Sequence, residues 1–401
     1  MSKPPRPPRR FLVPQDSGGV APPVAIYHVV SRVVDRQFVF GHEEKEHLRM
    51  LLRMYERFSG CRILSYCLMS NHLHVLLEVS PGCEKGESLG LSDEELIHRL
   101  GGLYSRNHTR LIAREIEEAR SLMDGRTPEG EVVPATEMAR RQRMKKEGEE
   151  WLHEIHARFS YRMHSLSEFF KGMLQRFTCW FNRERGRKGT LWESRFRSVI
   201  VQDGLAARTM AAYIDLNPVR AGIVDDPADY RWSSYGEAVG GGRGSSLARR
   251  GLVRALYAFD SRKGKEATSR AWSQGGMGKE YRRILIAEGV EQSEEDVHGR
   301  DGVRGGKVVK RRGMSKEDAE KELARLQEAD ARDLKVSKVI RCRVRYFTDG
   351  AVIGSKSFVD GIFKEARNCF GPKRKDGARR PRGALGELKG ELWSLRDLNV
   401  P

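Results

Sequence analysis

Hydrophobic and polar positions alternate in part along residues 24–34, VAIYHVVSRVV, and β-branched residues dominate the run. This pattern predicts a β-strand. A helix is predicted to follow at residues 43–60, because leucines recur there at helical spacing and Gly60 ends the pattern. Two further strands are predicted at residues 62–69 and 72–79, joined by a short polar turn.

Helical patterns dominate the middle of the chain. Residues 166–186 place their bulky apolar side chains mainly on one side, which predicts a helix packed against a core. A basic turn leading to a strand follows at residues 189–201, and a helix at residues 204–217 that Pro218 ends. Residues 81–163 are rich in Gly, Glu and Arg, and we interpret them as a solvated helical insertion.

The Gly-rich stretch GGGRGSS, which begins at residue 240, marks a change in composition and predicts a domain boundary. We therefore divide the chain into a disordered basic, Pro-rich tail (residues 1–23), a principal domain (residues 24–239, with the insertion at about 81–163) and a C-terminal extension (residues 240–401).

The C-terminal extension is predicted to be mostly helical. Residues 315–332 form a helical pattern in which Ser315 and Asp318 resemble an N-terminal cap. A short strand is predicted at residues 341–350 and another helix at residues 355–371.

Charge indicates the partner. The chain has 73 Lys and Arg against 55 Asp and Glu, a formal net charge of +18, which favours binding to nucleic acid. We find no secretory signal, no apolar run of membrane-spanning length and no basic amphipathic helix, and we predict a cytoplasmic, nucleoid-associated protein. The six cysteines include no CxxC pair, so neither a zinc ribbon nor a disulfide framework is indicated.

Two histidines provide the first candidate chemistry. In NHLHVLLEV, His72 and His74 are two residues apart on a predicted strand, so the pleat turns both imidazoles to one face. They would supply half of a small metal coordination sphere and leave room for a substrate oxygen. Taken alone, the motif also fits a purely structural histidine pair.

A tyrosine provides the second candidate chemistry. In AAYIDLNPVRAG, Tyr213 and Asn217 are four residues apart, which places them on one helical face. A phenol is a poor nucleophile near its free pKa of about 10, so it needs a nearby cation, and the Asn217 amide oxygen could complete a metal site. The alternative is a packing tyrosine followed by an ordinary helix-terminal asparagine.

A basic segment lies between these motifs. It interleaves guanidinium groups with an aromatic ring, as expected where phosphates are bound and a base stacks, although a solvated loop fits equally. Its members are Arg183, Arg185, Arg187, Lys188, Trp192, Arg195 and Arg197.

Taken in order, YHVVSR, SYCLMSNHLHVLLEV, LSEFFKGMLQRFTCWFNRERGRKGTLWESRFRS and AAYIDLNPVRAG closely resemble the REP-associated tyrosine transposases of the single-tyrosine HUH superfamily. The resemblance spans roughly residues 24–236, interrupted by the insertion. It implies an α+β fold: a ferredoxin-like antiparallel sheet that contains the histidine strand, with helices on one face. The extension lies outside this unit, and its Lys/Arg cluster suggests auxiliary DNA binding.

The resemblance also implies an activity, that of a metal-dependent single-strand DNA endonuclease and strand transferase acting on hairpin or palindromic repeats. Tyr213 would form a 5′-phosphotyrosine link, while His72, His74 and Asn217 would hold Mg²⁺ or Mn²⁺. Ligand softness alone would favour Mn²⁺ or Zn²⁺. The expected DNA contacts are Arg32, Arg185, Lys188, Trp192, Arg195 and Arg197, in a monomer or homodimer.

Two other functions remain open: a domesticated protein that binds DNA hairpins without cutting them, and an RNA-binding module. The joint presence of His72, His74, Tyr213 and Asn217 favours the enzyme, because a pure binder has no use for that set. The sequence has no GxxxxGK[ST] loop. None is needed, since a phosphotyrosine link would keep the bond energy required for strand joining.

Overall fold

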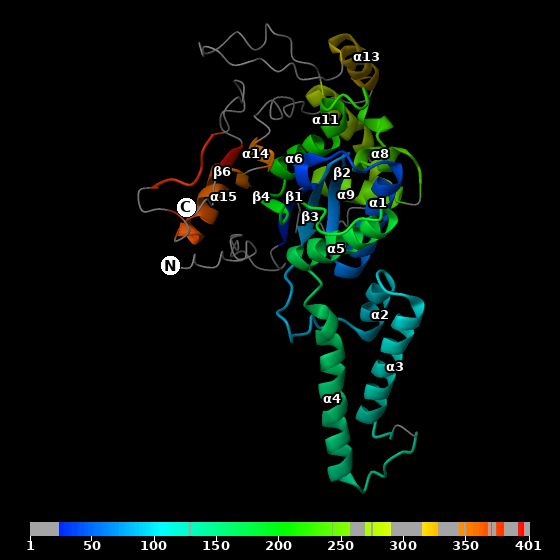
Figure 1. The fold of residues 1–401 in the computed structure, drawn as a ribbon. Helices are drawn as coiled ribbons and strands as arrows, with labels where there is room; N and C mark the ends of the chain where they lie inside the picture. The colour runs from blue at the N-terminus through cyan, green and yellow to red at the C-terminus, as the bar shows by residue number, and fades with distance from the viewer. Residues whose placement is uncertain are drawn as a thin grey trace. The chain divides into compact units, whose positions relative to one another are not determined.

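The computed structural model is described in segments that cover most of the first 256 residues and parts of the rest (Figure 1). They are residues 24–127, 130–242, 244–256, 269–273, 276–289, 315–327, 345–348, 350–367, 370, 374–380 and 392–396. The predicted tail, residues 1–23, lies outside them. The chain divides into two units: Met1–Glu46, Ile63–Glu78 and Gly189–Pro401 form the first, and His47–Arg62 and Val79–Lys188 form the second.

The first unit is built on a six-stranded sheet with the order β2-β3-β1-β4-β5-β6 (Figure 1). The strands are β1 (Ala25–Arg32), β2 (Arg62–Leu68), β3 (His72–Val79), β4 (Arg197–Val201), β5 (Gly350–Gly354) and β6 (Trp393–Arg396). β1 pairs with β4 and β5 with β6 in antiparallel fashion, whereas β4 and β5 are parallel. The predicted fold class, α+β with a mostly antiparallel sheet and helical additions, is confirmed.

Helices of the first unit accompany this sheet. They are α6 (Leu205–Asp215), α7 (Asn217–Arg220), α8 (Ser234–Val239), α9 (Ser245–Leu256), α10 (Ser269–Ser273), α11 (Met277–Gly289), α13 (Lys316–Gln327), α14 (Arg345–Thr348) and α15 (Lys356–Glu365), with 3₁₀ turns η2 (Val34–Arg36) and η3 (Pro227–Asp229). Every residue of α6 from Ala206 to Asp215 is buried except Arg208, so α6 is a central core helix. This burial fixes the position of Tyr213.

A buried carboxylate ties the end of α6 to its surroundings. Asp215 accepts hydrogen bonds from the Tyr281 hydroxyl (2.6 Å) and the Tyr235 backbone N–H (2.9 Å), with Ser65 Oγ at 3.4 Å. Burial raises the pKa of Asp215 to about 7 although these hydrogen bonds oppose the shift. The donors come from β2, α8 and α11, so the helix that carries Tyr213 is held from three sides.

The second unit is helical and includes residues 81–163, the predicted insertion. Its helices are α2 (Asp93–Gly101), α3 (Arg106–Met123), α4 (Met138–Ser160) and α5 (Leu166–Glu184), together with most of α1 (His42–Ser59). α3 and α4 pack along each other as a hairpin (Figure 1). Their approach is close, because a Cβ on Gly148 would lie 2.6 Å from the Ala119 carbonyl oxygen.

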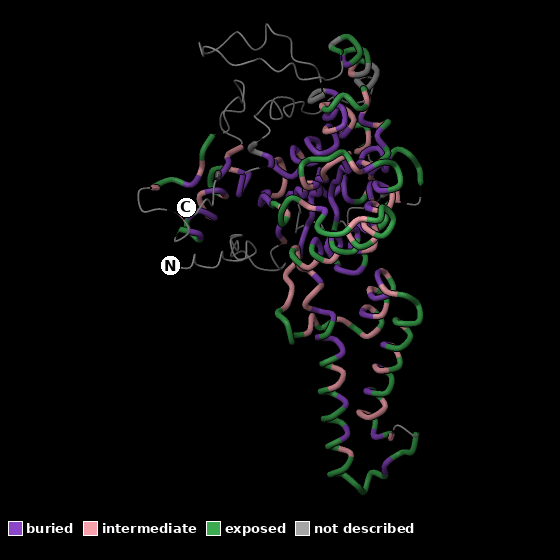
Figure 2. Tube along the Cα trace, in the orientation of Figure 1, coloured by how far each residue is buried: buried purple, intermediate pink, exposed green. Residues whose placement is uncertain are grey.

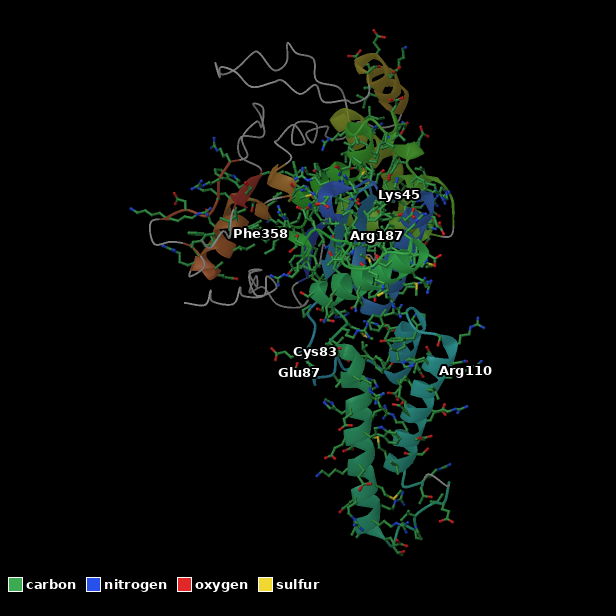
Figure 3. All side chains as sticks on the ribbon, in the orientation of Figure 1. Lys45, Cys83, Glu87, Arg110, Arg187 and Phe358 are labelled. Atoms are coloured by element: carbon green, nitrogen blue, oxygen red, sulfur yellow. The ribbon has the colours of Figure 1, made fainter. Side chains whose placement is uncertain are left out.

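Burial on this hairpin follows the helical period. Ile112, Ile116 and Ala119 of α3 are buried, as are Met144 and Gly148 of α4, and Figure 2 shows buried and exposed positions alternating along both helices. Arg110 on α3 is exposed (Figure 3). In the loop before α2, Glu87 is exposed and Cys83 is partly exposed. The predicted helical character of this region is present, with a small apolar seam between α3 and α4, whereas its status as an insertion stays a prediction.

The structure corrects two local predictions. Arg345–Thr348 form α14 rather than a strand, and the strand of this region is β5, which begins at Gly350. α6 ends at Asp215, before Pro218, which lies instead in the first turn of α7, where its missing N–H costs nothing. The predicted cap is confirmed, since Ser315 Oγ accepts from the Asp318 N–H at 3.1 Å. No helix among the described residues is long and apolar enough to cross a membrane.

Candidate active site

The two motif histidines and the tyrosine meet in the first unit. His72 and His74 lie on β3, and their ring centroids are 5.0 Å apart. Tyr213 comes from α6, and its ring centroid lies 5.9 Å from that of His74, edge to face. Residues separated by about 140 positions in the sequence are therefore neighbours, as a site with a metal beside a nucleophile requires.

A third histidine joins them. His28 on β1 stacks on His74 with ring centroids 5.2 Å apart, and its ring lies 6.2 Å from that of Tyr213. Its Nε2 is 3.0 Å from His74 Nδ1, and its Nδ1 is 2.7 Å from the Phe347 carbonyl oxygen. β1 and β3 are adjacent in the sheet, which explains the contact.

Burial keeps these imidazoles neutral. Desolvation lowers the pKa of His28 to about 4 and outweighs the hydrogen bond to the Phe347 carbonyl, which acts to raise this pKa. Desolvation, assisted by the charge of Arg32, lowers the pKa of His72 to about 4. The pKa of His74 lies well below its usual value, because of burial first and then the nearby His72, His28 and Arg32. Neutral imidazole is the form that binds metal.

Asn217 contacts the tyrosine through the backbone. It is the first residue of α7, and its Nδ2 donates to the Tyr213 carbonyl (3.0 Å) and the Ile214 carbonyl (3.2 Å). These bonds satisfy carbonyl groups that the end of α6 leaves without a helical partner. Both use the amide nitrogen, so the amide oxygen is the atom that could bind a cation.

The C-terminal extension covers the tyrosine. Phe347 of α14 stacks on Tyr213 with ring centroids 4.6 Å apart and planes inclined by 15°. The guanidinium of Arg220 also lies 5.0 Å from the centroid of the Tyr213 ring. Tyr213 is 2% exposed and Phe347 3%. Phe347 is therefore one of the side chains that bury Tyr213.

The expected DNA contacts divide between the units. Arg32 is half-buried at the end of β1, and its backbone carbonyl oxygen accepts a hydrogen bond from the Glu193 N–H at 2.9 Å. Its positive charge helps to lower the pKa of both His72 and His74. Trp192 forms a β-bridge with Val33. The remaining members are exposed: Arg195 and Arg197 in the first unit, and Arg185 and Lys188 in the second.

A family model described as "Transposase IS200 like" matches residues 23–109. Residues 23–109 are therefore similar to an IS200-like transposase domain. The match confirms the family resemblance found in the motifs; it includes His72 and His74 and ends before Tyr213. A solved structure of a REP-associated tyrosine transposase bound to a REP hairpin is similar at 14% identity and a TM-score of 0.28, covering 66% of this chain and 96% of that chain. No curated protein matches the sequence.

Transposases of this family generally use a divalent metal, and the residues present fit one. Among the described residues, no group of three or more His, Cys, Asp or Glu side chains is arranged to hold a metal ion. The donor atoms that this candidate site offers are the imidazole nitrogens of His72 and His74 on β3 and the amide oxygen of Asn217 on α7. That mixed set suits a cation that must also bind phosphate.

Sequence reasoning missed three residues of the candidate site. His28 lies in YHVVSR, but the sequence does not indicate which strand lies beside the histidine strand. Arg220 lies seven residues after Tyr213, on the same side of two consecutive helices. Phe347 carried no signal, because it reaches the site only through long-range folding of the extension.

Proposed function

We propose that the chain is a metal-dependent single-strand DNA endonuclease and strand transferase that acts on hairpin or palindromic repeat DNA. The observation that carries this proposal is the convergence of Tyr213 with His72 and His74: the Tyr213 ring is 5.9 Å from the His74 ring, and the two histidine rings are 5.0 Å apart. The hairpin substrate follows from the family resemblance of the motifs, and the net charge of +18 suits any DNA strand.

Cleavage would proceed through Tyr213. Its hydroxyl oxygen forms a bond to phosphorus as the bond from phosphorus to the 3′ oxygen breaks. Tyr213 loses its phenolic proton, the departing oxygen gains one, and the products are a 5′-phosphotyrosine and a free 3′-hydroxyl. Attack of a 3′-hydroxyl on that link reverses the step and joins strands without ATP.

Residues around Tyr213 support this step. Asn217 holds the backbone carbonyl of Tyr213, which fixes the last turn of α6. The Arg220 guanidinium, 5.0 Å from the phenol ring, stabilises negative charge that develops on the ring oxygen. A bound Mg²⁺ or Mn²⁺, held by His72, His74 and Asn217, would supply Lewis-acid polarisation of the phosphoryl oxygen.

Covalent adduct formation tests the proposal. Full-length protein mixed with a labelled single-stranded DNA hairpin and Mn²⁺ should yield a protein–DNA species that survives denaturing electrophoresis. Chelation of the metal should reduce that species by at least about a hundredfold, because a phenol needs a cation to act as nucleophile near pH 7. Equal adduct yields with and without chelator would contradict a metal-dependent reaction.

The cover over Tyr213 gives a second prediction. Phe347→Ala should raise the initial rate of adduct formation roughly fivefold, because an aromatic stack of about 1 kcal/mol no longer holds the covered state. The rate is measured with the same hairpin. Phe363→Ala is the matched control: Phe363 is also a buried phenylalanine of the extension but packs on Phe370. An unchanged rate in Phe347→Ala would mean that the cover does not limit access.

The burial of Tyr213 favours one alternative, a hairpin-binding protein that no longer cuts. That alternative predicts hairpin affinity without adduct, both in the wild type and in Phe347→Ala. The two proposals are separated by the adduct assay alone, since both predict binding.

A further inference from the structure

His28 is the histidine of this cluster to which the sequence motifs assign no role. It is 0% exposed, and each ring nitrogen has a partner: Nδ1 lies 2.7 Å from the Phe347 carbonyl oxygen and Nε2 lies 3.0 Å from Nδ1 of His74. A histidine with both nitrogens engaged has no lone pair for a metal. His28 is therefore not a third ligand, and it acts on His74 instead.

The direction of these hydrogen bonds follows from their first member. A carbonyl oxygen only accepts, so Nδ1 of His28 carries the hydrogen. A neutral imidazole has one N–H and one lone pair, so Nε2 of His28 accepts, and Nδ1 of His74 must donate to it. The lone pair of His74 is then on Nε2. His28 is 0% exposed, and complete burial favours the neutral form of an imidazole.

His72 reaches the same state through a different partner. Its Nδ1 lies 2.6 Å from Oδ1 of Asn71, and an amide oxygen also only accepts. The lone pair of His72 is therefore also on Nε2. The two histidines of the motif thus present the same ring nitrogen, each with its other nitrogen tied to a neighbour.

We propose that His28 is a positioning residue that fixes His74 in its metal-binding tautomer, and that the Phe347 carbonyl of the C-terminal extension holds His28 in turn. The inference rests on the metal-dependent function proposed above. It gives the extension, which lies outside the matched transposase domain, a part in metal affinity. Loss of such a supporting partner typically costs roughly 10–100-fold in metal affinity.

The first measurement needs neither DNA nor metal. In metal-free full-length protein with ¹⁵N-labelled histidine, ring nitrogen shifts should show His74 protonated on Nδ1 and bare on Nε2; the His74 signals are assigned with His74→Ala. A wild-type His74 protonated on Nε2 would overturn the proposal. Because this readout involves no cleavage, it stands even if no covalent adduct ever forms, which separates failure of this inference from failure of the proposed function.

The second measurement is Mn²⁺ affinity, followed by the electron paramagnetic resonance signal of free Mn²⁺. His28→Phe keeps a ring of similar volume but removes the acceptor, so affinity should fall roughly 10–100-fold. His28→Gln should recover most of it, because its amide oxygen can accept from His74 Nδ1 while its amide nitrogen donates to Phe347. If His28→Phe fails to fold, the proposal is still tested by the Mn²⁺ affinity of His28→Gln and by the His74 tautomer of the wild type.

His156→Phe is the matched control. His156 is also a buried histidine, with Nε2 2.9 Å from Asp93 Oδ1, but it belongs to the second unit. Its loss should leave both the His74 tautomer and Mn²⁺ affinity unchanged. Wild-type affinity in folded His28→Phe, or an equal loss in His156→Phe, would reject the assignment of His28 as a positioning residue.

Discussion

Tyr213→Phe should abolish the covalent DNA adduct completely while hairpin affinity stays within about twofold of the wild type. The substitution deletes only the hydroxyl oxygen that would attack phosphorus and keeps the ring that packs against Phe347 and His74. DNA affinity, in contrast, depends mainly on cations that contact phosphates, and these are unchanged. Denaturing electrophoresis of the labelled hairpin measures the adduct, and an equilibrium shift assay measures binding.

A matched control separates chemistry from stability in that experiment. Tyr230→Phe also removes a buried hydroxyl, one that donates to the Leu68 carbonyl at 2.6 Å, and should keep the adduct. Loss of the adduct in both variants would indicate a folding defect. An adduct that persists in Tyr213→Phe would place the nucleophile on another residue and remove the basis of the proposed mechanism.

Local pattern sufficed for the residues that lie within one element. The alternation of β3 placed His72 and His74 together, and helical spacing placed Tyr213 near Asn217, although Asn217 proved to begin a separate short helix. Pattern could not supply His28 or Phe347. Their role depends on which strand lies beside β3 and where residues 345–348 return, and neither follows from spacing along the chain.

The same limit applies to the fold. The strands and helices between residues 24 and 217 follow hydrophobic periodicity closely, because their apolar side chains are mostly buried. β5 was missed because its sequence, GAVIG, is short and bounded by glycines, and its strand conformation comes from pairing with β4 and β6. The division of the chain at residues 23 and 239 stays a prediction. The described part of the extension adds two strands to the sheet that carries the motif histidines.

A buried ion pair cluster behind the sheet gives the largest expected effect on stability. Arg254 of α9 lies 2.6 Å from Glu78 Oε2 and 2.8 Å from Asp203 Oδ2, and its side chain is 5% exposed. Arg254→Leu would remove the cation that lies 2.6 Å from the Glu78 carboxylate, which is 9% exposed. Such a loss typically costs about 3–5 kcal/mol, so calorimetry should show the unfolding transition of the first unit lowered by roughly 5–15 °C.

Two further variants show whether loss of the Arg254–Glu78 ion pair causes the loss of stability. Arg250→Leu removes an exposed arginine from the same helix and should change stability by less than about 0.5 kcal/mol. The double variant Arg254→Leu, Glu78→Leu removes the buried carboxylate as well, and it should recover much of the loss, because apolar packing can replace a buried ion pair. A double variant as unstable as Arg254→Leu would instead assign the loss to Asp203 and to packing of the arginine stem, and the link between β3 and α9 would then be apolar rather than electrostatic.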